Sequence, residues 1–283
     1  DSNDNVFVSG QVQGILTENG HGGGYDTFVT KYDKNGLELF TRQAAPFAND
    51  GALSMSLDSD DNVFLAGFTQ SEIAPGEGFG GNTDAFITKL DNSGNLLYDR
   101  QLGGRNPGPD ASEENIDAIA IAPNGDIWVS GEDDESIFIS HYEEGNNGNR
   151  TVHVIGNAGE DKITDLAVDA NGDVYGTGFS SVAFLSPVVQ AKQNGLDAFV
   201  FQLGQNGQFV YRTFIGTAAD DKAFGIDVNP NTGEFQVSIN NPVVPGMHEW
   251  THTFTATTKK TKLITNCITC ISDILGQTIK DVS

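Results

Sequence analysis

The chain has 283 residues, enough for one large all-β domain or two smaller ones. Its 34 glycines and low content of charged residues (19%) suit a turn-rich β protein. The net charge of −24 argues against nucleic acid and anionic membrane surfaces as partners, and no stretch reaches the roughly 18 apolar residues of a membrane span.

A short phrase recurs along the chain: an Asx- or Gly-rich turn followed by a strand with a bulky or aromatic residue near its centre. The clearest copy is Asp58–Phe68. Other copies begin at Asp1, Pro123, Asp169 and, more faintly, Asn229. If the phrase starts each unit, the chain divides into 1–57, 58–122, 123–168, 169–228 and a divergent 229–283. These unit lengths are near the period of propeller blades.

Each of the first four units predicts four short strands separated by turn residues, which is the pattern of a propeller blade. In the second unit the strands are expected at 63–68, 83–91, 96–101 and 116–122. In the fifth unit strands are expected at 234–239 and 262–268, so this unit is either a degenerate blade or a C-terminal extension. The sequence therefore predicts an all-β fold, a β-propeller of about five blades of four antiparallel strands, with a degenerate last blade.

Two segments share the pattern Asp-x-Phe-x-Thr-Lys after a glycine-rich loop: Gly23–Tyr32 and Gly80–Leu90. They resemble the bacterial β-propeller repeats known as SBBP repeats, and the resemblance continues through Arg100–Gly104. It covers the first four units and fades in the fifth. The resemblance implies a propeller, usually in large secreted or surface proteins, and it implies no particular reaction. We therefore expect an extracellular or cell-surface location.

The acidic turns are candidate calcium sites. Carboxylate and amide oxygens alternate in two of them: Asp58, Asp60 and Asn62 in one, and Asp169, Asn171 and Asp173 in the other. Ca²⁺ binds about 6–8 oxygen ligands, which such a loop can supply in part. The same residue types also suit hairpin turns for conformational reasons, and neither turn carries the downstream Glu of an EF-hand. A structural turn and a bound calcium ion both remain open.

No residue set predicts catalysis or a required cofactor. Asp26, Asp84 and Asp197 recur at one position of the repeat, which favours a structural role, because a catalytic site normally breaks the symmetry of repeats. His248 and His252 lack the other residues of a zinc motif. No nucleophile elbow, P-loop or dinucleotide fingerprint is present in the sequence.

The C-terminal part carries the remaining candidates. Cys267 and Cys270 form a Cys-x-x-Cys pair, for which a disulfide or an intermolecular bond is favoured over a redox or zinc site. The tail 251–269 is rich in Thr and contains three lysines, a charge that could dock against an acidic face of another subunit, including a copy of this chain. Asn149 begins a glycosylation sequon.

From these features the sequence favours a non-enzymatic extracellular module for structure, adhesion or subunit assembly, such as a filament or surface-layer component. One alternative is a propeller enzyme that acts on polysaccharide, with its site in the central channel. Another is a calcium-stabilised adhesin. The sequence does not choose a ligand or a partner among these.

Overall fold

The computed structural model describes residues 1–17, 24–44, 49–74, 83–102, 114–133, 136–143, 150–154, 161–183, 195–216, 219–240, 250–257 and 260–264. The secondary structure of these residues consists of strands β1 to β19 without a helix, so none of them belongs to a helix that could cross a membrane. The chain forms two compact units, Asp1–Ala158 and Gly159–Ser283. This confirms the predicted all-β class.

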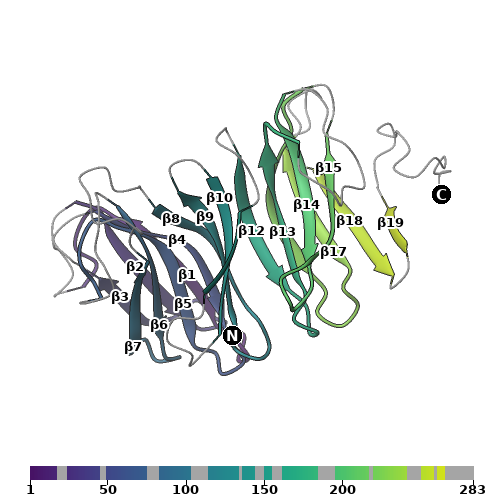
Figure 1. Ribbon diagram of the computed structural model, residues 1–283. Helices are drawn as coiled ribbons and strands as arrows, with labels where there is room; N and C mark the ends of the chain where they lie inside the picture. The colour runs from purple at the N-terminus through teal and green to yellow at the C-terminus, as the bar shows by residue number, and fades with distance from the viewer. Residues whose placement is uncertain are drawn as a thin grey trace. The chain divides into compact units, whose positions relative to one another are not determined.

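Unit 1 contains three antiparallel sheets, each a meander of consecutive strands (Figure 1). The first has three strands: β1 (Val6–Val12), β2 (Asp26–Tyr32) and β3 (Glu38–Ala44). The second has four: β4 (Asp50–Leu57), β5 (Val63–Thr69), β6 (Asp84–Leu90) and β7 (Leu96–Leu102). The third also has four: β8 (Glu114–Ile121), β9 (Ile127–Asp133), β10 (Ser136–Tyr142) and β11 (Arg150–Val154).

Unit 2 contains two further four-stranded meanders. One consists of β12 (Lys162–Val168), β13 (Val174–Ser180), β14 (Asp197–Leu203) and β15 (Phe209–Ile215). The other consists of β16 (Lys222–Val228), β17 (Phe235–Asn240), β18 (Trp250–Thr257) and β19 (Lys260–Ile264). In all five sheets the period-2 runs of β-branched and aromatic residues form the strands, and the Asx/Gly turns join them.

Every four-stranded sheet begins one strand before the repeated phrase. β4 belongs to the sequence unit 1–57, yet it pairs with β5 of the next unit from Leu57↔Val63 onward. The turn that opens the phrase is the cause, because it closes a hairpin: the Asp58 N–H donates to the Asn62 carbonyl at 3.1 Å. β8, β12 and β16 are displaced in the same way. The repeat period is kept, but sequence units and sheets are offset by one strand.

The glycine of the phrase lies opposite a β-bulge. In the β4–β5 pair the register shifts between Ala52 and Ser54, facing Gly67. A Cβ at Gly67 would lie 1.9 Å from the carbonyl oxygen of Gly51, so only glycine fits there. The same 1.9 Å approach recurs at Gly178, opposite the bulge in β12. The glycine of the repeat thus accompanies a bulge in the first strand of three four-stranded sheets, at Gly67, Gly131 and Gly178.

The core lies between neighbouring sheets of a unit. Val29 of β2 packs with Val63 and Leu65 of β5 and with Phe86 of β6, which joins the first and second sheets. The central aromatic residue of the phrase is fully buried in β5, where Phe64 has 0% exposure. Replacing it with alanine would cost about 3–5 kcal/mol by the usual cost of a large cavity.

Candidate functional site

A cavity of about 420 Å³ lies between the first two sheets of unit 1. Its apolar wall is formed by core side chains of β2, β5 and β6: Val29, Leu65, Phe86 and Leu90. Arg42, Asn95 and Leu96 also line it and are exposed, so they mark its open side. The volume is within the range of small-molecule sites.

Asp99 is a carboxyl group of this cavity with a perturbed proton affinity. It lies on β7 directly opposite Thr88 of β6, and both residues line the cavity. The Thr88 hydroxyl donates to Asp99 Oδ1 at 2.6 Å. Burial raises the pKa of Asp99, and this hydrogen bond opposes the shift only in part. Asp99 therefore holds a proton at higher pH than an ordinary aspartate does, as a general acid requires.

Asp50 is a second and more deeply buried carboxyl group of the cavity. It is 3% exposed, and the Thr69 hydroxyl donates to its Oδ1. Among the described residues, none hydrogen-bonds its Oδ2. Burial raises the pKa of Asp50 to about 6, with a further contribution from the nearby carboxylate of Asp26. A buried carboxyl oxygen with no partner marks a place where a ligand group can bind.

Arg42 brings a positive charge to the open side. Its Nε donates to the Gly94 carbonyl at 2.9 Å, and its Nη2 lies 3.5 Å from Asn95 Oδ1. These contacts tie the guanidinium of β3 to the turn between β6 and β7, across the gap between the two sheets. Guanidinium groups bind hydroxyl and carboxylate oxygens of ligands, so Arg42 is placed to orient a polar substrate.

The repeated aspartates at the strand starts are part of the scaffold. Asp26 and Asp84 are fully buried, and each accepts a hydrogen bond from a glutamine of the outer strand of its own sheet. Gln43 Nε2 lies 2.7 Å from Asp26 Oδ2, and Gln101 Nε2 lies 2.8 Å from Asp84 Oδ2. Asp197, at the equivalent place in unit 2, is also fully buried.

The first of the two acidic turns uses its carboxylate to hold the turn together. Asp58 Oδ1 accepts hydrogen bonds from the backbone N–H groups of Asp60 (3.0 Å) and Asn62 (2.9 Å). Asp58 Oδ2 accepts from Asn62 Nδ2 at 2.9 Å and lies 3.0 Å from Lys89 Nζ. Both carboxylate oxygens of Asp58 are therefore bonded within the turn or to Lys89, as expected for a turn with a structural role.

The second acidic turn repeats this geometry. Asp169 Oδ1 accepts from the backbone N–H groups of Asn171 (2.9 Å) and Asp173 (3.0 Å). Asp173 Oδ2 accepts from Gln202 Nε2 at 3.0 Å. Burial and the neighbouring Asp169 raise the pKa of Asp173. The described residues contain no group of three or more acidic, histidine or cysteine side chains arranged to hold a metal, and calcium at these turns stays a prediction.

Several sequence candidates lie outside the described residues: Asn149, His248, Lys259, Cys267 and Cys270. His252 lies on β18, and Lys260 and Lys262 lie on β19. The cavity residues Arg42, Asp50 and Asp99 were not singled out in the sequence. One repeated feature could have drawn attention to Asp50. An acidic residue stands at, or directly before, the start of the first strand of each four-stranded sheet: Asp50, Glu114, Asp161 and Asp221.

The meandering sheets of three or four strands, with a cavity between two of them, define an all-β protein of propeller type. A scan of protein-family models gives no match. The regulatory protein FlaEY of Caulobacter vibrioides is 26% identical over 245 residues, which cover 73% of this chain. This chain spans only 25% of the length of that relative.

Two solved structures share the fold. The NanB sialidase of Streptococcus pneumoniae superposes with a TM-score of 0.55 at 7% identity, over 93% of this chain and 58% of that one. A protein from Lactobacillus plantarum superposes with a TM-score of 0.52 at 14% identity, over 93% of this chain and 68% of that one. At these identities the likeness supports the β-propeller fold.

These findings correct the main functional expectation from the sequence. A non-enzymatic module for structure, adhesion or assembly was favoured because the repeats showed no asymmetric polar site. One of the two solved structures that share the fold is an enzyme, the sialidase. Within the cavity Asp99 breaks the repeat, because the residue in its place on the outer strand of the first sheet is Thr41, which lies opposite Thr30 as Asp99 lies opposite Thr88. Of the functions inferred from the sequence, the propeller enzyme is the better supported.

Proposed function

We propose that this chain is a propeller enzyme that acts on polysaccharide, and that the cavity between the sheets β1–β3 and β4–β7 binds the sugar. The observation that carries the proposal is Asp99, a carboxyl group with a raised pKa in a cavity large enough for a sugar ring. The sialidase with the same fold supports the choice of a carbohydrate, since a sialidase acts on a sugar. The site lies between two sheets, whereas the sequence alternative placed it in a central channel.

The proposed chemistry is cleavage of a glycosidic bond by acid catalysis. Asp99, protonated, donates its proton to the bridging oxygen as the bond from that oxygen to the sugar carbon breaks. Water then adds its oxygen to the sugar carbon, and the proton that it releases restores Asp99. Asp50 is the second carboxyl group of the cavity, and its Oδ2, which no described group hydrogen-bonds, is placed to hydrogen-bond a sugar hydroxyl. Arg42 orients the substrate through its hydroxyl or carboxylate oxygens.

The test is the release of reducing ends from a panel of neutral and acidic polysaccharides by the full chain. Loss of the general acid in Asp99→Asn should lower kcat by about 10²–10⁴-fold. Arg42→Gln should raise KM more than it lowers kcat, because Arg42 binds and does not transfer protons. The matched control is Asp60→Asn, an exposed turn residue, which should keep full activity. No release by the wild-type chain from any substrate of the panel, or full activity in Asp99→Asn, would overturn the proposal.

Several finer statements are proposals that rest on the sequence repeats. We propose that the propeller has five blades, one for each described sheet, and that the repeats are of the SBBP type. An extracellular or cell-surface location and contacts with other protein subunits also stay predictions, and at the acidic turns the structural role is preferred to bound calcium.

A further inference from the structure

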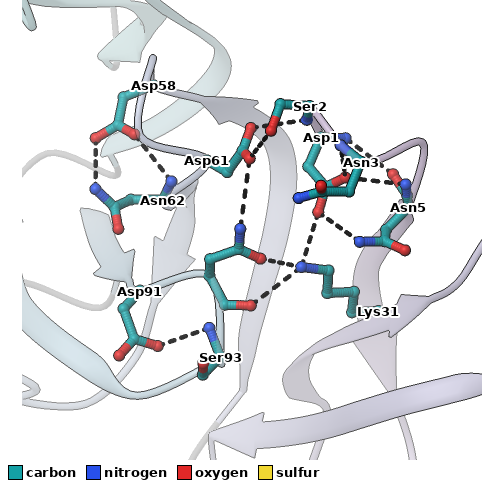
Figure 2. A network of polar contacts seen from close by, with 11 residues as sticks. Asp1, Ser2, Asn3, Asn5, Lys31, Asp58, Asp61, Asn62, Asp91 and Ser93 are labelled. Atoms are coloured by element: carbon teal, nitrogen blue, oxygen red, sulfur yellow. Dashed lines mark hydrogen bonds and ion pairs between the residues drawn. The ribbon is translucent and has the colours of Figure 1, made fainter.

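The amine of Lys31 in the first sheet of unit 1 meets a half-buried carboxamide in a turn of the second sheet; Figure 2 shows Lys31 with its acidic neighbours Asp1 and Asp61. Lys31 of β2 is 5% exposed, and its Nζ lies 4.8 Å from the centre of the Phe7 ring. The same Nζ lies 2.8 Å from Asp1 Oδ2. It also donates to both oxygens of Asn92, to the backbone carbonyl at 3.2 Å and to the side-chain Oδ1. Asn92 lies in the turn between β6 and β7.

A carboxylate lies on the other side of the same carboxamide. Asn92 Nδ2 donates to Asp61 Oδ2 at 3.5 Å. Asp61 is itself fixed by Ser2, whose backbone N–H and hydroxyl donate to it at 2.9 Å and 2.5 Å (Figure 2). The carboxamide of Asn92 is therefore held between an amine at its oxygen and a carboxylate at its nitrogen.

We propose that Lys31 and Asn92 form an intramolecular isopeptide bond. An amine hydrogen-bonded to Oδ1 is close to Cγ, because a carbonyl bond is only about 1.23 Å long. Two groups held at such a distance react as one molecule, with a large gain over the reaction in free solution. The Phe7 ring and the low exposure of Lys31 shield the amine, whereas Asn92 is half-buried.

The reaction balances without an oxidant or a co-reactant. The Lys31 ammonium first gives a proton to the Asp1 carboxylate, which leaves a neutral amine. Burial favours this form, since it lowers the pKa of Lys31 even though Asp61 opposes the shift. The Nζ–Cγ bond forms, the Cγ–Nδ2 bond breaks, and Nδ2 leaves as ammonia with the second proton of the amine, relayed by Asp61. The ammonia takes the first proton back from Asp1, so the products are the amide and an ammonium ion.

The second sheet offers a matched control. Lys89 occupies the same place in β6 and forms the same kind of ion pair, 3.0 Å from Asp58. In the following sequence repeat the residue that corresponds to Asn92 is Glu144, which has no carboxamide. The ion pair is therefore a shared feature of the two sheets, and Lys89 serves as a lysine in the same strand position whose corresponding residue in the next repeat is not an asparagine.

The experiment is the intact mass of the purified full chain, followed by peptide mapping. The bond removes one ammonia, so the mass should be about 17 Da below that of the sequence. Mapping should find one branched peptide that joins the Lys31 segment to the Asn92 segment, with no tryptic cleavage after Lys31. A wild-type chain with the full sequence mass would overturn the proposal.

Variants separate this bond from a succinimide, which Asn92 and Ser93 could form with the same loss of mass. Lys31→Arg keeps the positive charge but cannot form the amide, so it should have its full sequence mass. Lys89→Arg should keep the loss of about 17 Da. If Lys31→Arg also shows the loss, a succinimide explains it and the isopeptide bond is refuted. Asp61→Ala should slow the reaction, seen as a mixture of the two masses, because Asp61 positions the carboxamide.

Discussion

Lys89 Nζ lies 3.0 Å from Asp58 Oδ2, with both side chains nearly buried at 9% and 8% exposure. The contact ties the third strand of the second sheet to the turn that opens the repeated phrase. Burial alone would raise the pKa of Asp58, but hydrogen bonds from Asn62 and the contact with Lys89 lower it overall. The first sheet repeats the contact with Lys31 and Asp1, 2.8 Å apart. In the first two sheets the aspartate that opens the phrase therefore forms an internal ion pair as well as a turn.

Replacing Lys89 with methionine should destabilise unit 1. The aliphatic stem would still pack on Phe64, over which Lys89 Nζ lies at 4.7 Å, but Asp58 would lose its cation in a buried place. Removing one partner of a buried pair costs about 3–5 kcal/mol. Since Asn62 and the turn N–H groups still bond Asp58, we expect the lower end of this range in urea unfolding at pH 7. The exposed Lys34→Met should change the free energy of unfolding by less than about 0.5 kcal/mol.

Gly67→Ala should be strongly destabilising, because its Cβ would lie 1.9 Å from the backbone oxygen of Gly51. Gly10 has the same place in the phrase of the first sheet, where the nearest atom to a new Cβ is on the flexible Phe28 ring at 3.3 Å. We expect Gly67→Ala to cost more than about 3 kcal/mol, and Gly10→Ala about 1 kcal/mol, measured as thermal and urea unfolding. Equal costs for the two variants would show that the bulge does not constrain Gly67.

The stability of the chain should depend on the ionisation of Asp50. Its pKa is about 6 in the folded state and 3.8 for an unperturbed group. The folded state thus binds more protons than the unfolded state between these values, and the contribution of Asp50 falls as pH rises from about 4 to 6. Asp50→Asn cannot ionise, so its free energy of unfolding relative to wild type should rise by about 1–2 kcal/mol over this range, after solvent screening is allowed for.

Urea unfolding of both proteins at pH 4, 5, 6 and 7 measures this difference. Asp60→Asn, in an exposed turn, serves as the control and should show a difference from wild type that is flat with pH. A flat difference for Asp50→Asn as well would mean that Asp50 titrates alike in the folded and unfolded chain.

Removal of divalent cations should leave the melting temperature unchanged. Both oxygens of Asp58 already accept hydrogen bonds from the turn or from Lys89, and Asp169 Oδ1 accepts two from its own turn. A calcium ion would have to compete with these bonds. Differential scanning calorimetry with EDTA and with excess Ca²⁺ makes the comparison. A rise of several degrees with Ca²⁺ would instead support the calcium prediction from the sequence.

The strands could be predicted from the sequence because the Asx/Gly turns and period-2 runs are local signals. The strands expected at 63–68 and 96–101 match β5 (Val63–Thr69) and β7 (Leu96–Leu102) to within one residue. The assignment of strands to sheets is not local. Val63 pairs with Leu57, on the other side of the turn that appeared to start a unit, because a tight turn joins neighbours in one sheet.

The candidate site could not be predicted in the same way. Asp50, Asp99 and Arg42 come from three strands in two sheets, and none of them belongs to the repeated phrase. Their meeting depends on how the first sheet packs against the second, through Val29, Val63 and Leu65. An aspartate on an outer strand carries no sign in the sequence that it faces a cavity. The sequence candidates outside the repeated phrase lie mainly in the C-terminal part, whereas the cavity lies between two regular sheets of unit 1.

The most direct test of the proposed site is the position of an oligosaccharide bound to the Asp99→Asn variant in a crystal. The substitution keeps the shape of the side chain and removes the acid, so a substrate should bind without being cleaved. We predict that the sugar occupies the cavity between β1–β3 and β4–β7, with one ring within hydrogen-bond distance of residue 99 and of Arg42. An oligosaccharide bound elsewhere on the chain, with this cavity empty, would contradict the account.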